Sequence, residues 1–208
     1  MLPKHELKIS QLKLAIEKKQ VIYVSKLIND TSWDNSFFET SEIKLLPVKI
    51  ILHRNNLYLG AYNFNVKEIV FYAIQQLLTI TFSNEKIVAD GYLKLFEREI
   101  KNRFSITKNI NNEIYAITLE IAPVLIDFIK QHNWHYTQKI TKIKNRYYLS
   151  LTCGINRELI GWLYQWMYNV KNIEPEIFKD YYKKALVKTE EVNKKENRLV
   201  YKNIFESK

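Results

Sequence analysis

A basic and aromatic segment over residues 136–148 is the part of the sequence best suited to chemistry. It carries four cations with no acidic residue between the first and the last of them: Lys139, Lys142, Lys144 and Arg146. Tyr136, Tyr147 and Tyr148 flank or interleave these cations. Cations that follow a phosphate backbone, next to rings that stack on bases, are typical of single-stranded nucleic-acid sites. We therefore predict that the four cations bind nucleic acid, and the alternative is a solvated hairpin tip.

The net charge of the chain supports a polyanionic partner. Residues 1–85 contain 10 basic and 8 acidic residues, and the remaining residues contain 22 and 14, so +8 of the total +10 lies in the second part. A surplus of this kind attracts nucleic acid. The alternative is a compositional bias. Lys, Asn and Ile are abundant throughout the chain, as an AT-rich genome would produce, and that bias alone would raise the isoelectric point.

The sequence has no pattern typical of an enzyme. The four glycines are scattered singly, so a Gly-rich phosphate loop is absent. His132 and His135 lie at a predicted helix end without a third metal ligand nearby. Cys153 has no obvious base, which favours a buried thiol over a nucleophile. We predict a protein that is not an enzyme and that has no metal and no cofactor.

Length and composition favour a globular protein of the cytoplasm. The 208 residues, 47% of them hydrophobic, are enough for one large domain or two small ones. No apolar run approaches the roughly 20 residues of a membrane span, and the N-terminus lacks the apolar core of a signal peptide. The single cysteine excludes an internal disulfide and fits a reducing compartment.

The hydrophobic pattern of the first part predicts a helix followed by short strands. Apolar residues recur at helical spacing over residues 6–19, and residues 29–40 have the polar character of a loop. Runs rich in β-branched and aromatic residues predict strands over 21–27, 43–53, 57–62, 68–72 and 77–82. Strands this short and close together favour a small meander or barrel.

The second part predicts a different order of elements. A charged stretch over residues 83–112, with a helix over 92–100, leads into the order β-α-β-β-α-β-α, which resembles a split βαβ, ferredoxin-like unit with an added helix. These elements are expected over 114–121, 122–131, 136–143, 146–153, 157–168 and 170–173, with the last helix opened by Pro175. We therefore divide the chain into a first domain (1–85), a hinge (86–112), a second domain (113–190) and a polar tail (191–208).

Residues 46–77 resemble the WYL-domain family. The segment reads LPVKIILHRNNLYLGAYNFNVKEIVFYAIQQL, with Pro47 at the leading proline of the family pattern and His53-Arg54 at its basic turn. Leu57-Tyr58-Leu59 occupies the place of the Trp-Tyr-Leu tripeptide, with Leu for Trp. The last motif of the pattern falls on residues 72–77.

The second part resembles the C-terminal extension that accompanies this domain in many bacterial regulators. Trp134-His135-Tyr136-Thr137-Gln138 matches its Trp-His-x-Ser-Gln signature. Glu158-Leu159 with Trp162-Leu163 matches its Glu-Leu-x-x-Trp-Leu helix, and residues 170–175 match its Val-x-x-x-x-Pro exit. The two resemblances together cover about residues 10–190.

This resemblance implies an α+β fold, with a small Sm/SH3-like β-barrel followed by a ferredoxin-like α/β domain. It implies a homodimeric module of transcriptional control that senses a nucleic acid or a small anionic ligand. Family members carry a winged helix-turn-helix domain, for which residues 1–20 are too short. We expect either a fragment of a regulator or a chain that acts with a partner.

The sequence departs from the family pattern where charge matters. Ala73 and Gln76 stand where the family has two arginines, and Gln75 stands where it has an aspartate. Each lost charge-assisted hydrogen bond is worth about 1.5–3 kcal/mol. We predict that the ligand is bound by residues around the barrel: Lys49, His53, Arg54, Tyr58, Tyr72 and Gln76. The alternative is a protein-interaction or dimerisation module with a degenerate pocket.

Overall fold

The computed structural model describes residues 4–29, 38–88 and 90–194, and the chain divides into two compact units, Met1–Glu99 and Ile100–Lys208. Both contain helices and one antiparallel sheet, which confirms the predicted α+β class. Within the described ranges, no helix is both long enough and apolar enough to cross a membrane.

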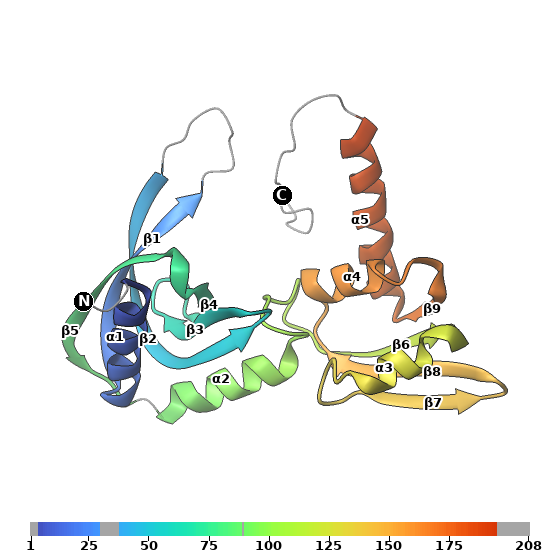
Figure 1. Cartoon of the computed structure of the whole chain (residues 1–208), viewed down its shortest axis with the longest axis horizontal. Coiled ribbons are helices and arrows are strands. Elements are labelled where there is room, and N and C mark those ends of the chain that lie inside the picture. The colour runs from blue at the N-terminus through green and yellow to red at the C-terminus, as the bar shows by residue number, and fades with distance from the viewer. Residues whose placement is uncertain (1–3, 30–37, 89, 195–208) are drawn as a thin grey trace. The chain divides into compact units, whose positions relative to one another are not determined.

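The first unit holds helix α1 (Lys4–Glu17) and a five-stranded sheet with the order β4-β3-β2-β1-β5 (Figure 1). The helix and the five strands predicted for this part are confirmed. The strands are β1 (Gln20–Asn29), β2 (Phe38–His53), β3 (Asn56–Asn63), β4 (Glu68–Ala73) and β5 (Leu77–Lys86), and the 3-10 turn η1 (Ile74–Gln76) precedes β5.

One expectation for this unit is wrong at its edges. Residues 29–40 were expected to be a loop, but β1 and β2 pair as far as Asn29 opposite Phe38. Strand pairing needs backbone hydrogen bonds rather than a hydrophobic pattern, so polar residues can extend a hairpin beyond the core. The middle of the expected loop, residues 30–37, lies outside the described residues.

The main hydrophobic cluster of the first unit lies on one face of its sheet. Alternate residues of the strands, such as Leu45, Leu59 and Ala61, are fully buried there together with Leu12 and Ala15 of α1. This is the period-two alternation of an antiparallel sheet, and the opposite face is also covered in part, because Leu46 and Ile69, which both pair with Tyr62, are buried there.

Helix α2 (Asp90–Asn102), close to the predicted 92–100, packs against the other face of β3. The Phe96 ring is 2% exposed and its centroid lies 5.7 Å from that of Phe71. A Cβ atom at Gly60 would lie 2.3 Å from a ring carbon of Phe96. Glycine at this position therefore allows the helix to approach the strand.

The second unit has a four-stranded antiparallel sheet with the order β7-β8-β6-β9 (Figure 1). Its elements follow the predicted order β-α-β-β-α-β-α. They are β6 (Tyr115–Ile121), the turn η2 (Pro123–Leu125) with α3 (Ile126–Gln131), β7 (Lys139–Ile143), β8 (Arg146–Cys153), α4 (Arg157–Tyr164), the turn η3 (Met167–Asn169), β9 (Val170–Glu174) and α5 (Glu176–Lys194).

Some predicted boundaries of this unit differ from the structure. β7 begins at Lys139 rather than at residue 136, because the Gln138 N–H donates to the His135 carbonyl in a turn. α4 ends at Tyr164, where the predicted helix continued to residue 168. α5 continues to Lys194, past the predicted start of the polar tail, because helix-favouring Glu and Lys residues need no core contact. The rest of that tail lies outside the described residues.

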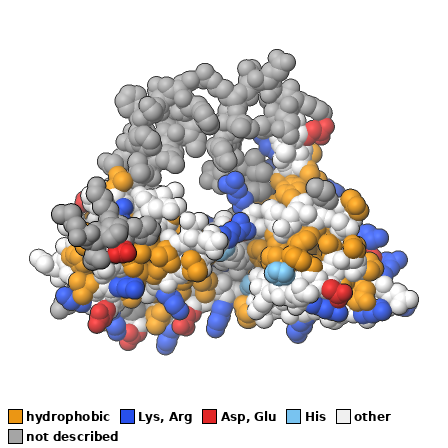
Figure 2. All heavy atoms as spheres, in the orientation of Figure 1, with side chains coloured by type: hydrophobic (Ala, Val, Ile, Leu, Met, Phe, Trp, Pro, Cys, Tyr) orange, Lys and Arg blue, Asp and Glu red, His pale blue; other side chains and the backbone are white. Residues whose placement is uncertain are grey.

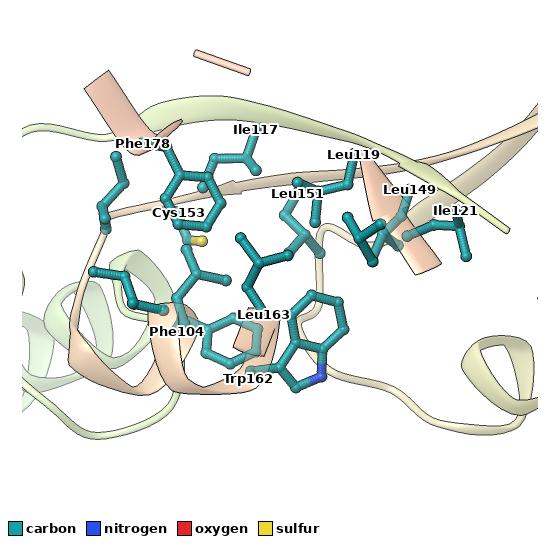
Figure 3. Packing of buried hydrophobic residues seen from close by; sticks show 14 of the residues in the cluster. Phe104, Ile117, Leu119, Ile121, Leu149, Leu151, Cys153, Trp162, Leu163 and Phe178 are labelled. Atoms are coloured by element: carbon teal, nitrogen blue, oxygen red, sulfur yellow. The ribbon is translucent and has the colours of Figure 1, made fainter. Parts of the chain in front are cut away.

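The core of the second unit also lies on one face of its sheet. Figure 3 shows Ile117 and Leu119 of β6 with Leu149 and Leu151 of β8, gathered near Leu163 of α4. Buried residues of all three helices join this same cluster, among them Ile126, Ile129, Leu159 and Phe178. The opposite face of the sheet is consequently left to the polar residues that alternate with the core.

Candidate functional site

The predicted basic turn of the first unit is the tight end of hairpin β2–β3. Arg54 and Asn55 both have a positive φ, 47° and 63°, between His53 and Asn56, which pair with each other. Two central residues of positive φ define a type I′ turn, which matches the twist of the strands it joins. Arg54 is exposed at this tip.

Three of the predicted ligand-binding residues share the face of the first sheet that is opposite its main hydrophobic cluster and against which α2 packs at Gly60. Tyr58 alternates with the core residue Leu59, so its ring lies on the side of Gly60, whose strand partner is Lys49. The His53 ring meets the Tyr58 ring edge-on at 5.9 Å. Lys49 is exposed, and the other two are partly exposed. Lys49, His53 and Tyr58 therefore form a small basic and aromatic surface, which we call the outer-face triad.

The other predicted ligand-binding residues lie elsewhere. Tyr72 is in the core of the first unit, where its hydroxyl accepts a hydrogen bond of 2.7 Å from Asn63 Nδ2. Burial raises the pKa of this hydroxyl. Gln76 is exposed in η1. Ala73 pairs directly with Tyr58 and is 8% exposed.

The predicted nucleic-acid residues of the second unit all lie on hairpin β7–β8, and all are exposed. Lys144 and Asn145, with φ of 45° and 64°, form a second type I′ turn. Lys142 pairs with Tyr147, and its ammonium lies 5.3 Å from the centroid of that ring. In Figure 2, Lys and Arg side chains are visible along the edge of this unit where Figure 1 draws β7.

The register of this hairpin divides the four cations between two faces. Lys142 is on the side of Ile140, which pairs with the core residue Leu149. Lys139 and Arg146 alternate with that set and lie on the outer face. The four cations therefore do not form one surface, because side chains of a strand alternate between faces.

Sequence reasoning missed a buried carboxylate on the outer face of the second sheet. The Glu120 side chain is 7% exposed, and its carboxylate lies 3.5 Å from Arg146 Nη1 and 3.8 Å from Lys171 Nζ. Asn172 Nδ2 donates a hydrogen bond to the same carboxylate. Glu120 pairs across the strands with Tyr148. The signal available was a lone acid that alternates with Leu119 and Ile121, but its partners come from other strands.

The signature around His135 holds the turn before β7. His135 Nε2 donates to the Lys101 carbonyl at 3.0 Å, and its Nδ1 lies 2.7 Å from Thr137 Oγ1. Gln138 accepts from the Trp134 N–H through Oε1 and donates to the His132 carbonyl through Nε2, at 3.1 and 3.0 Å. Desolvation by burial lowers the pKa of His135. These side chains are engaged in structural bonds.

The Glu158 signature residue fastens residues 104–107 to the start of α4. One carboxylate oxygen accepts from the backbone N–H groups of Ile106 and Thr107 at 3.1 and 3.0 Å, and from the Thr107 hydroxyl at 2.7 Å. Asn156 caps the helix by accepting from the Leu159 N–H at 3.0 Å and donates to the Phe104 carbonyl at 2.9 Å. The motif thus secures the entry to the helix.

Three tryptophans form an aromatic cluster on the helical side of the second unit. The centroids of Trp134, Trp162 and Trp166 lie 5.5 to 6.3 Å apart, and Phe128 lies 5.4 Å from Trp166. Their buried indole N–H groups have no hydrogen-bond acceptor among the described residues. Edge-to-face rings allow N–H groups to point at neighbouring π systems instead.

The residues considered for catalysis and metal binding have other surroundings. Burial raises the pKa of the Cys153 thiol to about 12, so it stays protonated and unreactive. His132 Nδ1 lies 2.8 Å from the Phe128 carbonyl, whereas His135 bonds to Lys101. Within residues 4–29, 38–88 and 90–194, no three His, Cys, Asp or Glu residues are grouped so that they could hold a metal ion.

Comparison with known proteins gives similarity at the level of structure alone. No protein-family model and no curated protein matches the sequence. The proteasome accessory factor B/C (PafBC) of Arthrobacter aurescens has a TM-score of 0.40 and 11% identity, over 93% of this chain and 28% of that one. A CRISPR Cas-related protein has a TM-score of 0.35 and 13% identity, over 91% and 52%. The chain thus spans about half or less of the length of these two proteins.

Proposed function

We propose that the chain is the sensing and dimerisation module of a bacterial WYL-type transcriptional regulator and has no catalytic role. The supporting observation is that each group of motifs falls within one of the two structural units. The segment that resembles the WYL domain falls within the first unit, and the two signatures of its extension fall within the second. Polar residues of those signatures, His135, Gln138 and Glu158, each secure a turn or a helix start.

We assign the first unit to the Sm/SH3-like barrels and the second to the ferredoxin-like domains. In the first unit, five antiparallel strands in meander order, with β5 placed beside β1, support this assignment. In the second, support comes from the β-α-β-β-α-β order and the sheet order β7-β8-β6-β9. The boundaries 1–85, 86–112 and 113–190 remain our proposal for the functional domains.

The ligand that we propose is anionic, with nucleic acid as its main candidate. The outer-face triad supplies one exposed cation, an imidazole and a phenol on one surface. The surplus of +8 after residue 85 favours a polyanion over a small anion.

A second candidate function is a protein-interaction or dimerisation module whose ligand pocket has degenerated. A specific observation favours it: Ala73 places a methyl group beside Tyr58, where the family pattern has a guanidinium. An apolar side chain there removes a charge-assisted hydrogen bond from the triad's surface.

Fluorescence anisotropy with a labelled single-stranded oligonucleotide of about 12 nucleotides separates the two functions. Sensing of nucleic acid requires binding that weakens steeply with salt, with a slope of about −0.7 in log K per phosphate contact. No binding at the lowest salt would favour the interaction module. Sedimentation equilibrium tests dimerisation, because a dimer doubles the mass of the 25.0 kDa chain.

A further inference from the structure

The outer face of the second sheet is polar, and the described helices of that unit pack on the other side. Core residues of β6 and β8, among them Leu119 and Leu149, lie on the helical face with α3, α4 and α5. The alternating residues on the outer face are mostly hydroxyl-bearing or charged, such as Thr118, Thr141 and Ser150. A solvated face of this kind is common in antiparallel sheets, so polarity alone does not indicate a site.

An aromatic ring near the middle of this face is the first distinguishing feature. Tyr148 belongs to β8, an interior strand, and is paired with Glu120 on one side and with Thr141 on the other. Its side chain is partly exposed. Sheets of four strands that present rings on their interior strands are known platforms for stacking unpaired bases.

Cations from three strands are the second feature. Lys139 of β7, Arg146 of β8 and Lys171 of β9 belong to the outer face, and the last two side chains are 62% and 70% exposed. Two acids oppose them. Glu174 is at the end of β9, and Glu120 is buried between Arg146 and Lys171. The face thus retains one excess positive charge, and Glu120 holds two of the cations in place beside the ring.

We propose that this outer face binds single-stranded nucleic acid, with Tyr148 stacking on a base and with Lys139, Arg146 and Lys171 contacting phosphates. The inference deepens the proposed function and rests on it. A single strand fits better than a duplex because a ring stacks only on a base that is free of its own neighbours. An open sheet face also has no protruding helix or strand that could enter a groove of a duplex.

Adjacent tyrosines on opposite faces supply a matched test with the full chain and the same labelled oligonucleotide. Tyr148→Ala should weaken binding by about 5- to 150-fold, because one stacked base is lost. Tyr148→Phe keeps the ring and should bind as the parent does. Tyr147→Ala is the control from the opposite face, where Lys142 covers the ring, and should change affinity less than about twofold. Melting temperatures identify any variant that has lost its fold.

A matched pair of double variants tests the phosphate contacts. Lys139→Gln with Lys171→Gln should lower the salt slope by about 1.4, whereas Lys142→Gln with Lys144→Gln should leave it unchanged. If the parent binds but the second pair changes the slope and the first does not, this face is wrong while nucleic-acid sensing stands. Equal effects of Tyr147→Ala and Tyr148→Ala, or equal affinity for duplex, would also overturn the face. A parent that binds no oligonucleotide at low salt overturns both proposals.

Discussion

Hairpins β2–β3 and β7–β8 end in the same kind of turn, but their strands occupy different places in their sheets. Both turns are type I′, with a cation followed by asparagine: Arg54-Asn55 and Lys144-Asn145. β2 and β3 are interior strands of the first sheet, whereas β7 is an edge strand of the second. Lysines on an edge strand discourage pairing with another chain, which gives Lys139 and Lys142 a structural role whether or not they bind a ligand.

This difference shows how a cluster of charges should be interpreted. In the first hairpin the basic turn is next to the outer-face triad, in which the His53 and Tyr58 rings meet. In the second hairpin the cations alternate in the sequence, and the register then separates Lys142 from Lys139 and Arg146. Proximity along the chain therefore indicates a common surface only after the face of each residue is known.

The largest expected effect concerns the cores beneath the two hairpins. Leu59 of β3 and Leu149 of β8 are both fully buried in separate clusters. Leu59→Ala and Leu149→Ala should each lower the free energy of unfolding of their own unit by about 2–5 kcal/mol. Hydrogen exchange read by mass spectrometry checks this, because faster exchange should be confined to the unit that carries the substitution. Faster exchange in both units from either substitution would mean that the units unfold together.

The elements of these hairpins are predictable from the sequence because local physics determines them. Alternating apolar residues define the strands, and the asparagines tolerate the left-handed backbone of the turns. The extension of β2 to Phe38 was not predictable, since its pairing leaves no hydrophobic pattern. The environment of Glu120 was not predictable either, because Arg146 and Lys171 reach it from β8 and β9, whose places follow only from the sheet order.

The candidate site was predictable to a smaller extent. Resemblance to the family pattern indicated the segment that carries Lys49, His53 and Tyr58, and these three share a face. It also indicated Tyr72, whose side chain points into the core, since a list of residues does not say which strand face each occupies. The second signature matched residues that secure turns, so there the resemblance indicated architecture rather than a binding surface.

Adding a positive charge beside Tyr58 should give the next largest effect. Ala73→Arg places a guanidinium on the face of the outer-face triad, where each charge-assisted hydrogen bond contributes about 1.5–3 kcal/mol. We expect the affinity for the labelled oligonucleotide to rise about 10- to 150-fold. Ala73→Gln, of similar length but neutral, is the control and should not raise it. Equal gains from both variants would exclude a charge effect.

Acid should weaken the base of the second hairpin. His135 bonds to Thr137, whose Oγ1 also accepts from the Thr152 N–H at 2.8 Å on β8. Burial lowers the pKa of His135 below 6.5, so the unfolded chain binds its proton more readily than the folded chain does. The stability that neutral His135 contributes is therefore present above pH 6.5 and is lost as the pH falls below it.

His135→Gln removes this contribution, which makes it the matched variant for urea denaturation. The stability gap between the parent and the variant should shrink as the pH falls from about 8 to about 5. Hydrogen exchange should show the loss in β7 and β8 and leave β2 and β3 unaffected. A gap that stays constant over this range would mean that His135 does not titrate with folding.

The smallest expected effect compares the turns themselves. Arg54 and Lys144 each have the left-handed backbone that glycine adopts freely. Relieving the strain of the left-handed backbone stabilises the folded chain by roughly 1–2 kcal/mol. The greater conformational freedom of glycine in the unfolded chain offsets about 0.5–1 kcal/mol of that gain. Lys144→Gly should thus stabilise the second unit by about 0.5–1 kcal/mol, as measured by urea denaturation.

Arg54→Gly relieves the same backbone strain but also removes the contacts of a side chain next to the outer-face triad. The shortfall of its gain relative to that of Lys144→Gly therefore measures what the Arg54 side chain contributes to the first unit. Equal gains would mean that the Arg54 side chain contributes nothing to the stability of the first unit.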